Sequence, residues 1–486
     1  MQDMHNTQQK RLIDQVQLAR LFSEFIDPSY VITDQETMRP YECDGLSAYT
    51  QIPMMVLLPD NIEQVQKVIR ICAQHEIPVV SRGAGTGLSG GALPHPEGVL
   101  LCLQKFNKIL HIDTDARTAR VQPGVRNLAI SEAVEKHGLY YAPDPSSQIA
   151  CSIGGNVAEN AGGVHCLKYG LTVHNILRLE MITAEGELLS LGGEGLDAAG
   201  FDLVALLTGS EGLLGVITEI TVKLLPIQEK TKVVMAGFDS VEQAANSVGA
   251  IIARGIIPAG LEMMDSLAIQ AAEDFANAGY PRDAEALLLC EVDGTEEEVD
   301  AHIALVEEIF NQFSASTVRV SQHEAERSLL WKGRKSAFPA VGRISADYYC
   351  MDGTIPRKQI AYVLGEMKAM SLRYDLRVAN VFHAGDGNLH PLILFDAAKQ
   401  GDFHKAEAFG AEILELCIKV GGTITGEHGV GVEKIRQMEI QFNAQELAQF
   451  HGIKGAFDSL QILNPGKGIP VLKRCQEYRA LSSHNH

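Results

Sequence analysis

The feature that most constrains this chain is the gathering of its glycines into a few loops that follow strand-like runs. The chain holds 45 glycines in 486 residues, above the usual share of about 7%. One cluster, residues 83–91, follows the apolar run 77–80 and precedes Pro94 and Pro96. Because glycine has no Cβ, such a loop can curve and lie directly against a ligand. We expect these clusters to bind an anionic ligand through backbone N–H groups. The alternative is a tight turn with no ligand.

Within this cluster, residues 85–90 fit the pattern G-x-G-x-x-G of dinucleotide-binding proteins. That fingerprint opens a helix and is followed about 20 residues later by an acidic residue. Two prolines stand where the helix is needed, and Gln104 and Lys105 stand where the acid is needed. The pattern therefore does not indicate an NAD site, although the loop can still approach a pyrophosphate.

Composition narrows the class of protein. The hydrophobic share of 46% and the charged share of 21% are those of a globular chain long enough for several domains. A net charge of −20 argues against nucleic acid as a partner. No signal peptide and no apolar run long enough to span a membrane is evident, so we expect a cytoplasmic location. The 9 cysteines contain no C-x-x-C pair, which predicts reduced thiols and no iron–sulfur cluster in this chain.

The strand and helix patterns divide the chain into four expected segments. Residues 1–54 are predicted as a helical lead-in, and residues 55–228 as a mixed strand-and-helix domain that carries most glycine clusters. In residues 229–454, strands alternate with long helices, which predicts an α+β domain with an antiparallel sheet. Residues 455–486 form a C-terminal segment that we expect to return to the first domain.

Two histidines flank an Asp-Gly pair in the second half of the chain. Asp386-Gly387 between apolar runs is a strong hairpin signal. A two-residue loop at these positions would place His383 directly opposite His390, close enough for both to bind one cation. A loop at residues 387–388 would remove that opposition. The alternative to a metal site is a cross-strand histidine pair without a ligand.

A further glycine-dense segment, residues 421–431, supplies neighbouring acidic and imidazole groups. Glu427 could join the two histidines as a third ligand, because two histidines and one carboxylate suit zinc, manganese or iron. His428 beside it is a natural general base, since its pKa lies near neutrality.

The glycine loops resemble the FAD domain of the vanillyl-alcohol-oxidase type, which is also called the PCMH type. The resemblance rests on residues 78–86, 143–146 with 152–156, 160–163 and 208–217. It implies a two-part FAD-binding domain. Thr86 stands where relatives with covalent flavin have histidine, so the resemblance implies noncovalent FAD. The implied cofactor-binding residues are Arg82, Gly83, Ala84, Gly85, Thr86, Gly87, Leu88, Ser89, Pro143, Asp144, Ser146, Ser152, Gly154, Gly155, Asn156, Asn160, Gly162, Gly163, Glu211, Gly212, Gly215, Val216, Ile217 and Asn464.

The histidine segments resemble the C-terminal domain of FAD-linked 2-hydroxy-acid dehydrogenases, which act on glycolate, D-lactate or D-2-hydroxyglutarate. The resemblance implies a divalent metal on His383, His390 and Glu427, with His428 as the base and hydride transfer to flavin N5. It also implies that Arg334, after Trp331, holds the substrate carboxylate, for which its planar fork is suited. The alternative for Arg334 is a solvated member of the basic run 332–335.

Two longer runs, residues 333–357 and 382–396, resemble the FAD subunit of bacterial glycolate oxidases. Phe338 stands where hydroxyglutarate enzymes are expected to hold a second carboxylate, which favours a small monocarboxylate such as glycolate, with D-lactate as a second substrate. The resemblance implies a second flavin-domain subunit and an iron–sulfur subunit as partners, and possible attachment at the inner face of the membrane through them. The rival hypotheses are a stand-alone D-lactate dehydrogenase and a flavin relay subunit without chemistry.

Overall fold

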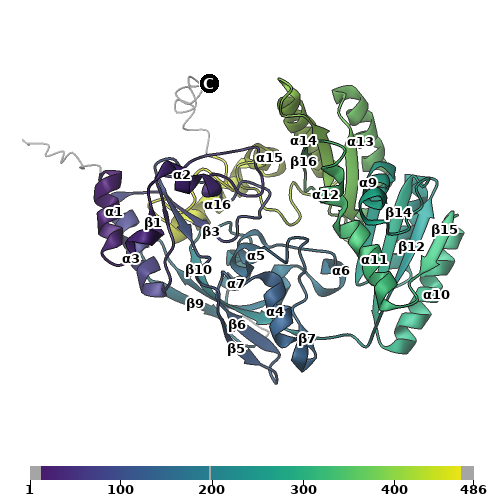
Figure 1. Ribbon diagram of the computed structural model, residues 1–486, viewed down its shortest axis with the longest axis horizontal. Coiled ribbons are helices and arrows are strands. Elements are labelled where there is room, and N and C mark those ends of the chain that lie inside the picture. Colours follow the sequence, from purple (N-terminus) through teal and green to yellow (C-terminus); the bar gives the residue numbers. More distant parts are fainter. Residues whose placement is uncertain (1–12, 196–198, 472–486) are drawn as a thin grey trace, which may run out of the picture.

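The computed structural model describes residues 13–195 and 199–471, which form two α+β halves lying side by side (Figure 1). The outer ends of the expected segments 1–54 and 455–486, including Cys475, lie outside the described residues. All cysteines within the described ranges are unpaired, as the sequence predicts. None of the helices in these ranges is both long and apolar enough to cross a membrane.

The first half begins with a small, mostly parallel sheet. Its strand order is β1-β2-β4-β3, and only β1 runs antiparallel to its neighbour. The helix α3 (Ile62–His75) covers this sheet with its apolar stripe of Val65, Val68, Ile69 and Cys72. The strands are β1 (Val31–Ile32), β2 (Met55–Leu57), β3 (Val79–Arg82) and β4 (Val99–Cys102), with α1 (Gln15–Ser23) and α2 (Gln35–Met38) before them. Because β1 belongs to this sheet, the described part of the lead-in is built into the first half.

An antiparallel sheet completes the first half, with the order β5-β6-β10-β8-β9. Its hairpin β8-β9 turns at residues 183–187. The strands are β5 (Ile109–Asp113), β6 (Thr118–Val121), β8 (Ile176–Ile182), β9 (Leu188–Gly192) and β10 (Val216–Lys223). Around it lie α4 (Asn127–Val134), α5 (Ile153–Glu159), α7 (Leu203–Leu207) and the pair β7 (Leu139–Tyr140) and β11 (Leu225–Pro226), whereas α6 (Cys166–Tyr169) contacts the second half.

The second half is built on one antiparallel sheet with the order β15-β12-β14-β13-β17-β18-β16. Alternate residues of its strands face opposite cores: Val234 and Ala236 pack with α8, α10, α13 and α14, whereas Val233 and Met235 pack with α9, α11 and α12. The strands are β12 (Lys230–Phe238), β13 (Gly260–Asp265), β14 (Ala286–Gly294), β15 (Thr317–Val320), β16 (Asp347–Cys350), β17 (Val378–His383) and β18 (Pro391–Phe395). The helices are α8 (Val241–Ala253), α9 (Ser266–Ala276), α10 (Glu296–Gln312), α11 (Glu324–Lys335), α12 (Ala337–Val341), α13 (Ile360–Tyr374) and α14 (Asp402–Lys419). This sheet confirms the predicted α+β class.

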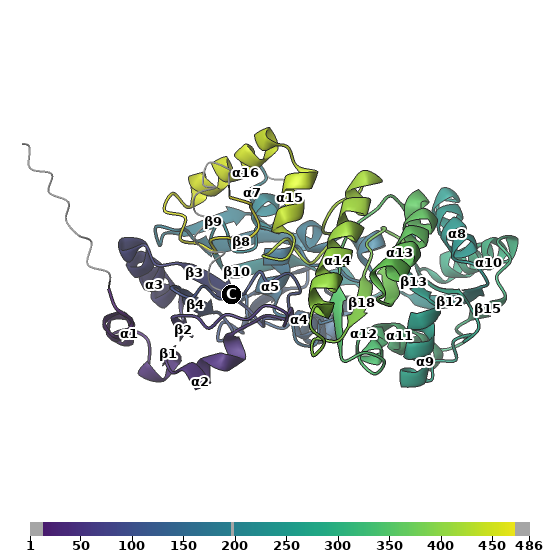
Figure 2. The ribbon, with the colours of Figure 1, turned by 90° about the horizontal axis from the view of Figure 1, so that it is seen from above.

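The helix α15 (Ile435–Gln441) packs on α14 of the second half, and α16 (Ala444–Phe457) then returns to the first half (Figure 2), where Ile453 and Phe457 pack against its core. The segment after α16 then runs along β3: the Val79 N–H donates to Ile462, and the Asn464 N–H donates to Val79. The expected boundary at residue 454 falls inside α16.

Candidate active site

A cavity of about 520 Å³ lies where the two halves meet. The first half lines it with its glycine loops, and the second half with side chains from α11, α12 and the two segments that carry the histidines. The predicted residues along its wall are Arg82, Gly83, Ala84, Gly85, Thr86, Gly87, Leu88, Ser146, Ser152, Gly154, Gly155, Asn156, Glu211, Gly212, Gly215, Ile217, Arg334, His390, Glu427 and His428. One cavity therefore brings the glycine loops to the predicted catalytic groups.

The glycine loop forms a wall that larger residues could not form. A Cβ on Gly83 would lie 2.2 Å from Ser152 Oγ, and one on Gly85 would lie 2.1 Å from Arg82 Nη2. Gly85 also has φ +72°, which disfavours other residues. The chain continues as a loop to β4 without opening a helix, so the structure agrees with rejection of the NAD fingerprint. A cavity lined by glycine backbone in this way fits FAD.

The remaining predicted cofactor-binding residues are not among those that line the cavity. Asn464 Nδ2 donates to the carbonyl oxygens of Gly91 and Glu211, tying together two loops at distances of 3.0 and 2.6 Å. Asn160 ends α5 with φ 52° and accepts a hydrogen bond from the Val173 N–H. These residues, for which direct cofactor contact stays a prediction, are Ser89, Pro143, Asp144, Asn160, Gly162, Gly163, Val216 and Asn464.

The hairpin that carries the two histidines differs from the predicted one. Asn380 pairs with Pro391, and His383 with Asn388, so the loop holds residues 384–387 and the two-residue loop is wrong. His383 thus lies diagonal to His390 instead of directly opposite. A shift of two residues keeps both side chains on one face, and their ring centroids are 5.1 Å apart.

His383, His390 and Glu427 converge around one point. Glu427 Oε1 lies 3.2 Å from His383 Nε2 and 2.8 Å from His390 Nε2. Their potential ligand atoms all lie within 4.8 Å of one another. Burial opposes the charge of Glu427, but the two histidines hold the pKa of its carboxyl well below the ordinary value. An ionised carboxylate with two imidazoles is a donor set that fits a divalent transition metal.

His383 is also held from behind by Glu262 of β13. Its Nδ1 lies 2.7 Å from Glu262 Oε1. Burial disfavours a charge on His383, but the Glu262 and Glu427 carboxylates raise the pKa of this imidazole well above its usual value. A metal-binding histidine commonly donates its second N–H to a carboxylate in this way.

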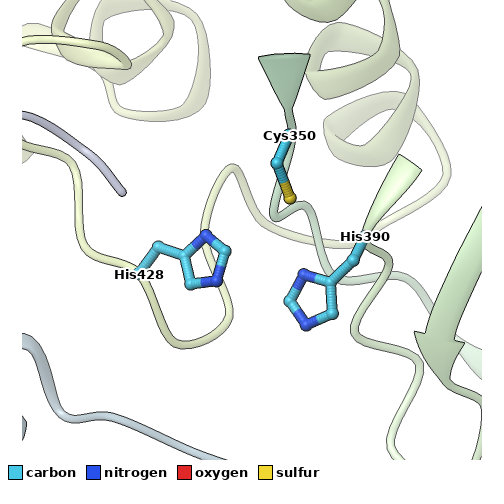
Figure 3. A group of neighbouring side chains, drawn as sticks. All are labelled: Cys350, His390 and His428. Carbon is cyan, nitrogen blue, oxygen red and sulfur yellow. The ribbon is translucent and has the colours of Figure 1, made fainter. Parts of the chain in front are cut away.

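His428 lies at the cavity wall, with its ring stacked on that of His390 at 5.0 Å and 14° (Figure 3). Burial lowers the pKa of His428 to about 4, so its imidazole is neutral at pH 7. Asp352 fixes its backbone by accepting hydrogen bonds from the N–H groups of Gly426, Glu427 and His428. A neutral, fixed imidazole can accept a proton from a bound substrate.

Cys350 lies near the same two histidines (Figure 3) and offers a second group of possible ligands with them. The rings of His390 and His428 are nearly parallel, and nitrogen lone pairs lie in the ring planes. Their lone pairs therefore do not converge on one point, and the His383 group fits a cation better.

Arg334 is buried, with 1% of its surface exposed, which excludes the solvated alternative. Its Nε and Nη2 contact Glu262 Oε2 at 2.9 and 2.6 Å. Arg334 also lines the cavity, as does Phe338, whose ring lies 6.4 Å from that of His390. A guanidinium and an apolar wall therefore adjoin the histidines. Lys335 also lines the cavity and lies 3.7 Å from Asp144.

Two residues that contact the predicted site residues, Glu262 and Asp352, were not predicted from the sequence. Glu262 stands in the apolar run 259–264, where an acid with no nearby basic residue is a signal of a buried partner. Asp352 precedes Gly353 and looks like an ordinary turn residue, so its role had no clear signal in the sequence.

Comparison with known proteins agrees with this geometry. Residues 53–192 match the family described as "FAD binding domain", and residues 227–468 match "FAD linked oxidases, C-terminal domain". The glycolate oxidase subunit GlcD of Escherichia coli strain K12 is 60% identical over 473 residues, which cover 97% of this chain and 95% of that protein. The chain belongs to the FAD-linked oxidase family. Its cofactor is FAD, and it is an oxidoreductase, as the sequence predicts.

This FAD-linked oxidase is also similar to a D-lactate dehydrogenase in sequence and to p-cresol methylhydroxylase in structure. The D-lactate dehydrogenase of Anaerostipes hadrus is 32% identical over 91% of this chain and 95% of its own length. The structure of p-cresol methylhydroxylase with substrate bound superposes with a TM-score of 0.79 at 18% identity, covering 94% of this chain and 97% of that one. This likeness confirms the predicted PCMH-type fold.

Proposed function

We propose that this FAD-linked oxidase oxidises glycolate to glyoxylate and, as a second substrate, D-lactate to pyruvate. The observation that carries the proposal is that Arg334 and His428 line one cavity together with His390 and Glu427, which form the possible metal-binding group with His383. The similarity to a protein named glycolate oxidase subunit and to one named D-lactate dehydrogenase supports the two substrates.

Different residues of the chain bind the substrate and accept its proton. Arg334 pairs with the substrate carboxylate, because a guanidinium suits a carboxylate in charge and shape. A ring nitrogen of His428 accepts the hydroxyl proton while the α-hydrogen leaves with its electron pair. FAD, when bound by the glycine loops, supplies the two-electron acceptor. A divalent metal held by His383, His390 and Glu427 would supply a positive charge for the α-hydroxyl oxygen.

Phe338 limits the size of the substrate. Its ring lines the cavity and packs against His390 and Tyr348, at 6.4 and 6.1 Å between centroids. An apolar wall there offers no partner for a second carboxylate. Lys335 is the side chain that could hold one, although Asp144 lies 3.7 Å from its ammonium group.

The electrons must then leave the chain. The sequence has no C-x-x-C pair for a cluster, and the relative in Escherichia coli is named a subunit. We propose that a second flavin-domain subunit and an iron–sulfur subunit receive the electrons. A relay role without chemistry is disfavoured, because it would not need the convergent histidines.

The test is anaerobic titration of the FAD- and metal-loaded chain with glycolate, D-lactate, L-lactate and D-2-hydroxyglutarate. Loss of oxidised-flavin absorbance with glycolate and D-lactate alone, abolished in His428→Ala, is the expected result. Reduction by D-2-hydroxyglutarate would overturn the role of Phe338 and implicate Lys335. Reduction by D-lactate but not glycolate would favour a D-lactate dehydrogenase.

A further inference from the structure

We propose that Glu262 is a positioning residue that fixes the metal ligand His383 and the substrate anchor Arg334 through a single carboxylate. The inference deepens the proposed function and rests on it.

Glu262 lies next to His383 in the sheet. The register of β13 and β17 pairs the two residues directly, so their side chains stand on one face at short range. Leu261 and Met263 belong to the core on the other face, which leaves Glu262 facing α11. Glu262 is 1% exposed. The strand thus holds a carboxylate away from water, between the histidine and the helix that carries Arg334.

Both carboxylate oxygens of Glu262 have a partner. Oε1 lies 2.7 Å from His383 Nδ1, whereas Oε2 accepts from Arg334 Nε and Nη2 at 2.9 and 2.6 Å. An ionised carboxylate can only accept hydrogen bonds. His383 Nδ1 must therefore carry a hydrogen, so Nε2, which faces Glu427, is the nitrogen that can bind a cation in place of its own proton. This contact selects the tautomer that a metal ligand needs.

The same carboxylate orients the guanidinium of Arg334. Its contacts use Nε and Nη2 and do not use Nη1. Because the guanidinium is planar, two contacts along one edge fix the orientation of its plane. Nη1, on the opposite edge, stays available for the substrate carboxylate. The Arg334 charge also balances Glu262, so the buried carboxylate adds no net charge beside the cation.

A purely structural ion pair would need only Glu262 and Arg334. Such pairs add little to stability and can often be replaced by apolar residues. The third partner, His383, is what a positioning role requires.

The experiment measures the affinity of the FAD-loaded, chelator-treated full chain for Zn²⁺ by isothermal titration calorimetry. Glu262→Gln is expected to raise the Zn²⁺ Kd about 10–100-fold, the usual effect of losing such a contact. Glu291→Gln is the matched control. Glu291 is similarly buried at 2%, stands on the neighbouring strand β14, and bonds His165, Arg327 and Trp331 instead of a metal ligand. Its Zn²⁺ Kd should equal that of the wild type.

Arg334→Gln tests whether the effect of Glu262 on Zn²⁺ binding comes from its contact with His383 or from any disturbance of the buried ion pair. It leaves the His383–Glu262 contact in place, so the Zn²⁺ Kd should stay unchanged or fall while the KM for glycolate rises. An unchanged Kd in Glu262→Gln, or an equal loss in Arg334→Gln, would overturn the inference. If Glu262→Gln fails to fold, the double variant Glu262→Gln/Arg334→Met removes both charges together, and a Kd equal to the wild type would overturn it.

Zn²⁺ binding by the wild type and by His390→Ala tests the metal site of the proposed function independently of Glu262. If the wild type binds no Zn²⁺, or if its Zn²⁺ binding persists in His390→Ala, the metal site itself is contradicted. Binding that depends on His390 but not on Glu262 would contradict only the positioning role.

Discussion

Gly162 of the first half lies directly against Glu427 of the second half. A Cβ on Gly162 would lie 2.3 Å from Glu427 Oε2 and 3.2 Å from its Cβ. The glycine therefore makes room for the carboxylate that joins His383 and His390. The loop that follows α5 thus helps to place a residue more than 260 positions later in the chain.

Gly162→Ala should consequently displace Glu427 and weaken Zn²⁺ binding about 10-fold or more, since it moves a ligand itself. Titration calorimetry of the FAD-loaded chain measures this effect. Gly249→Ala in α8 is the control, because nothing lies within 4 Å of its added Cβ. Equal Zn²⁺ affinity in the two variants would show that Gly162 has no part in placing Glu427.

Asp352→Asn should loosen the segment that carries Glu427 and His428. Asp352 is fully buried, accepts from successive backbone N–H groups and lies 3.5 Å from the Lys434 ammonium. Removing one partner of a buried ion pair costs about 3 kcal/mol or more, so the free energy of unfolding in urea should fall by that amount. Asp347→Asn on the nearby strand β16, which accepts one bond from an exposed N–H, should change it by less than about 1 kcal/mol. Similar values for both variants would contradict the role of Asp352.

The loops that line the cavity were predicted correctly from the sequence, whereas the loop length of the histidine hairpin was not. Glycine spacing shows where the backbone can approach a ligand, because the absence of a side chain is a local property. The loop of the histidine hairpin depends on contacts from elsewhere: Arg357 donates to the Gly385 carbonyl, and Ile355 donates to that of Gly387. Asp386 also accepts from the Asn388 N–H. These contacts favour a loop of residues 384–387 over the two-residue turn.

The groups behind the site were harder to predict for the same reason. Glu262 meets Arg334 and His383 only because β13 pairs with β17 and packs under α11. Single-sequence periodicity gives neither strand order nor helix placement. The predicted ligands His383, His390 and Glu427 could be found because their residue types are themselves informative.

His165 should make the stability of the protein depend on pH. It joins Asp144 of the first half to Glu291 of β14, with 2.9 Å from Nδ1 to Asp144 and from Nε2 to Glu291; Arg327 and Lys335 face the same carboxylates. Burial disfavours the imidazolium, but the two carboxylates outweigh it and raise the pKa of His165 to about 10. A raised pKa stabilises the folded state fully below about pH 6.5, the value in an unfolded chain, and this contribution is lost toward pH 10.

The difference in free energy of unfolding between the wild type and His165→Gln should therefore be largest below about pH 6.5 and shrink as the pH rises to about 10. Urea titrations of both proteins across this range measure it. A difference that stays constant with pH would show that His165 is not charged between the two halves.

Phe338→Ala should widen the range of substrates. Removing the ring opens the wall beside His390, so kcat/KM for D-2-hydroxyglutarate relative to glycolate should rise about 10-fold, the scale of a modest change in pocket size. Phe338→Leu should give a smaller change in the same direction. A ratio that does not move in either variant would place the size limit elsewhere.

The proposed function requires that glycolate deliver two electrons and its α-hydrogen to this chain's flavin, with His428 taking the hydroxyl proton. Anaerobic stopped-flow reduction of the FAD- and metal-loaded chain, by glycolate and by glycolate deuterated at the α-carbon, measures this step. We expect full flavin reduction, one glyoxylate per flavin, a slower rate with the deuterated substrate, and loss of reduction in His428→Ala. A flavin that stays oxidised in the loaded wild-type chain would show that glycolate is not the electron donor.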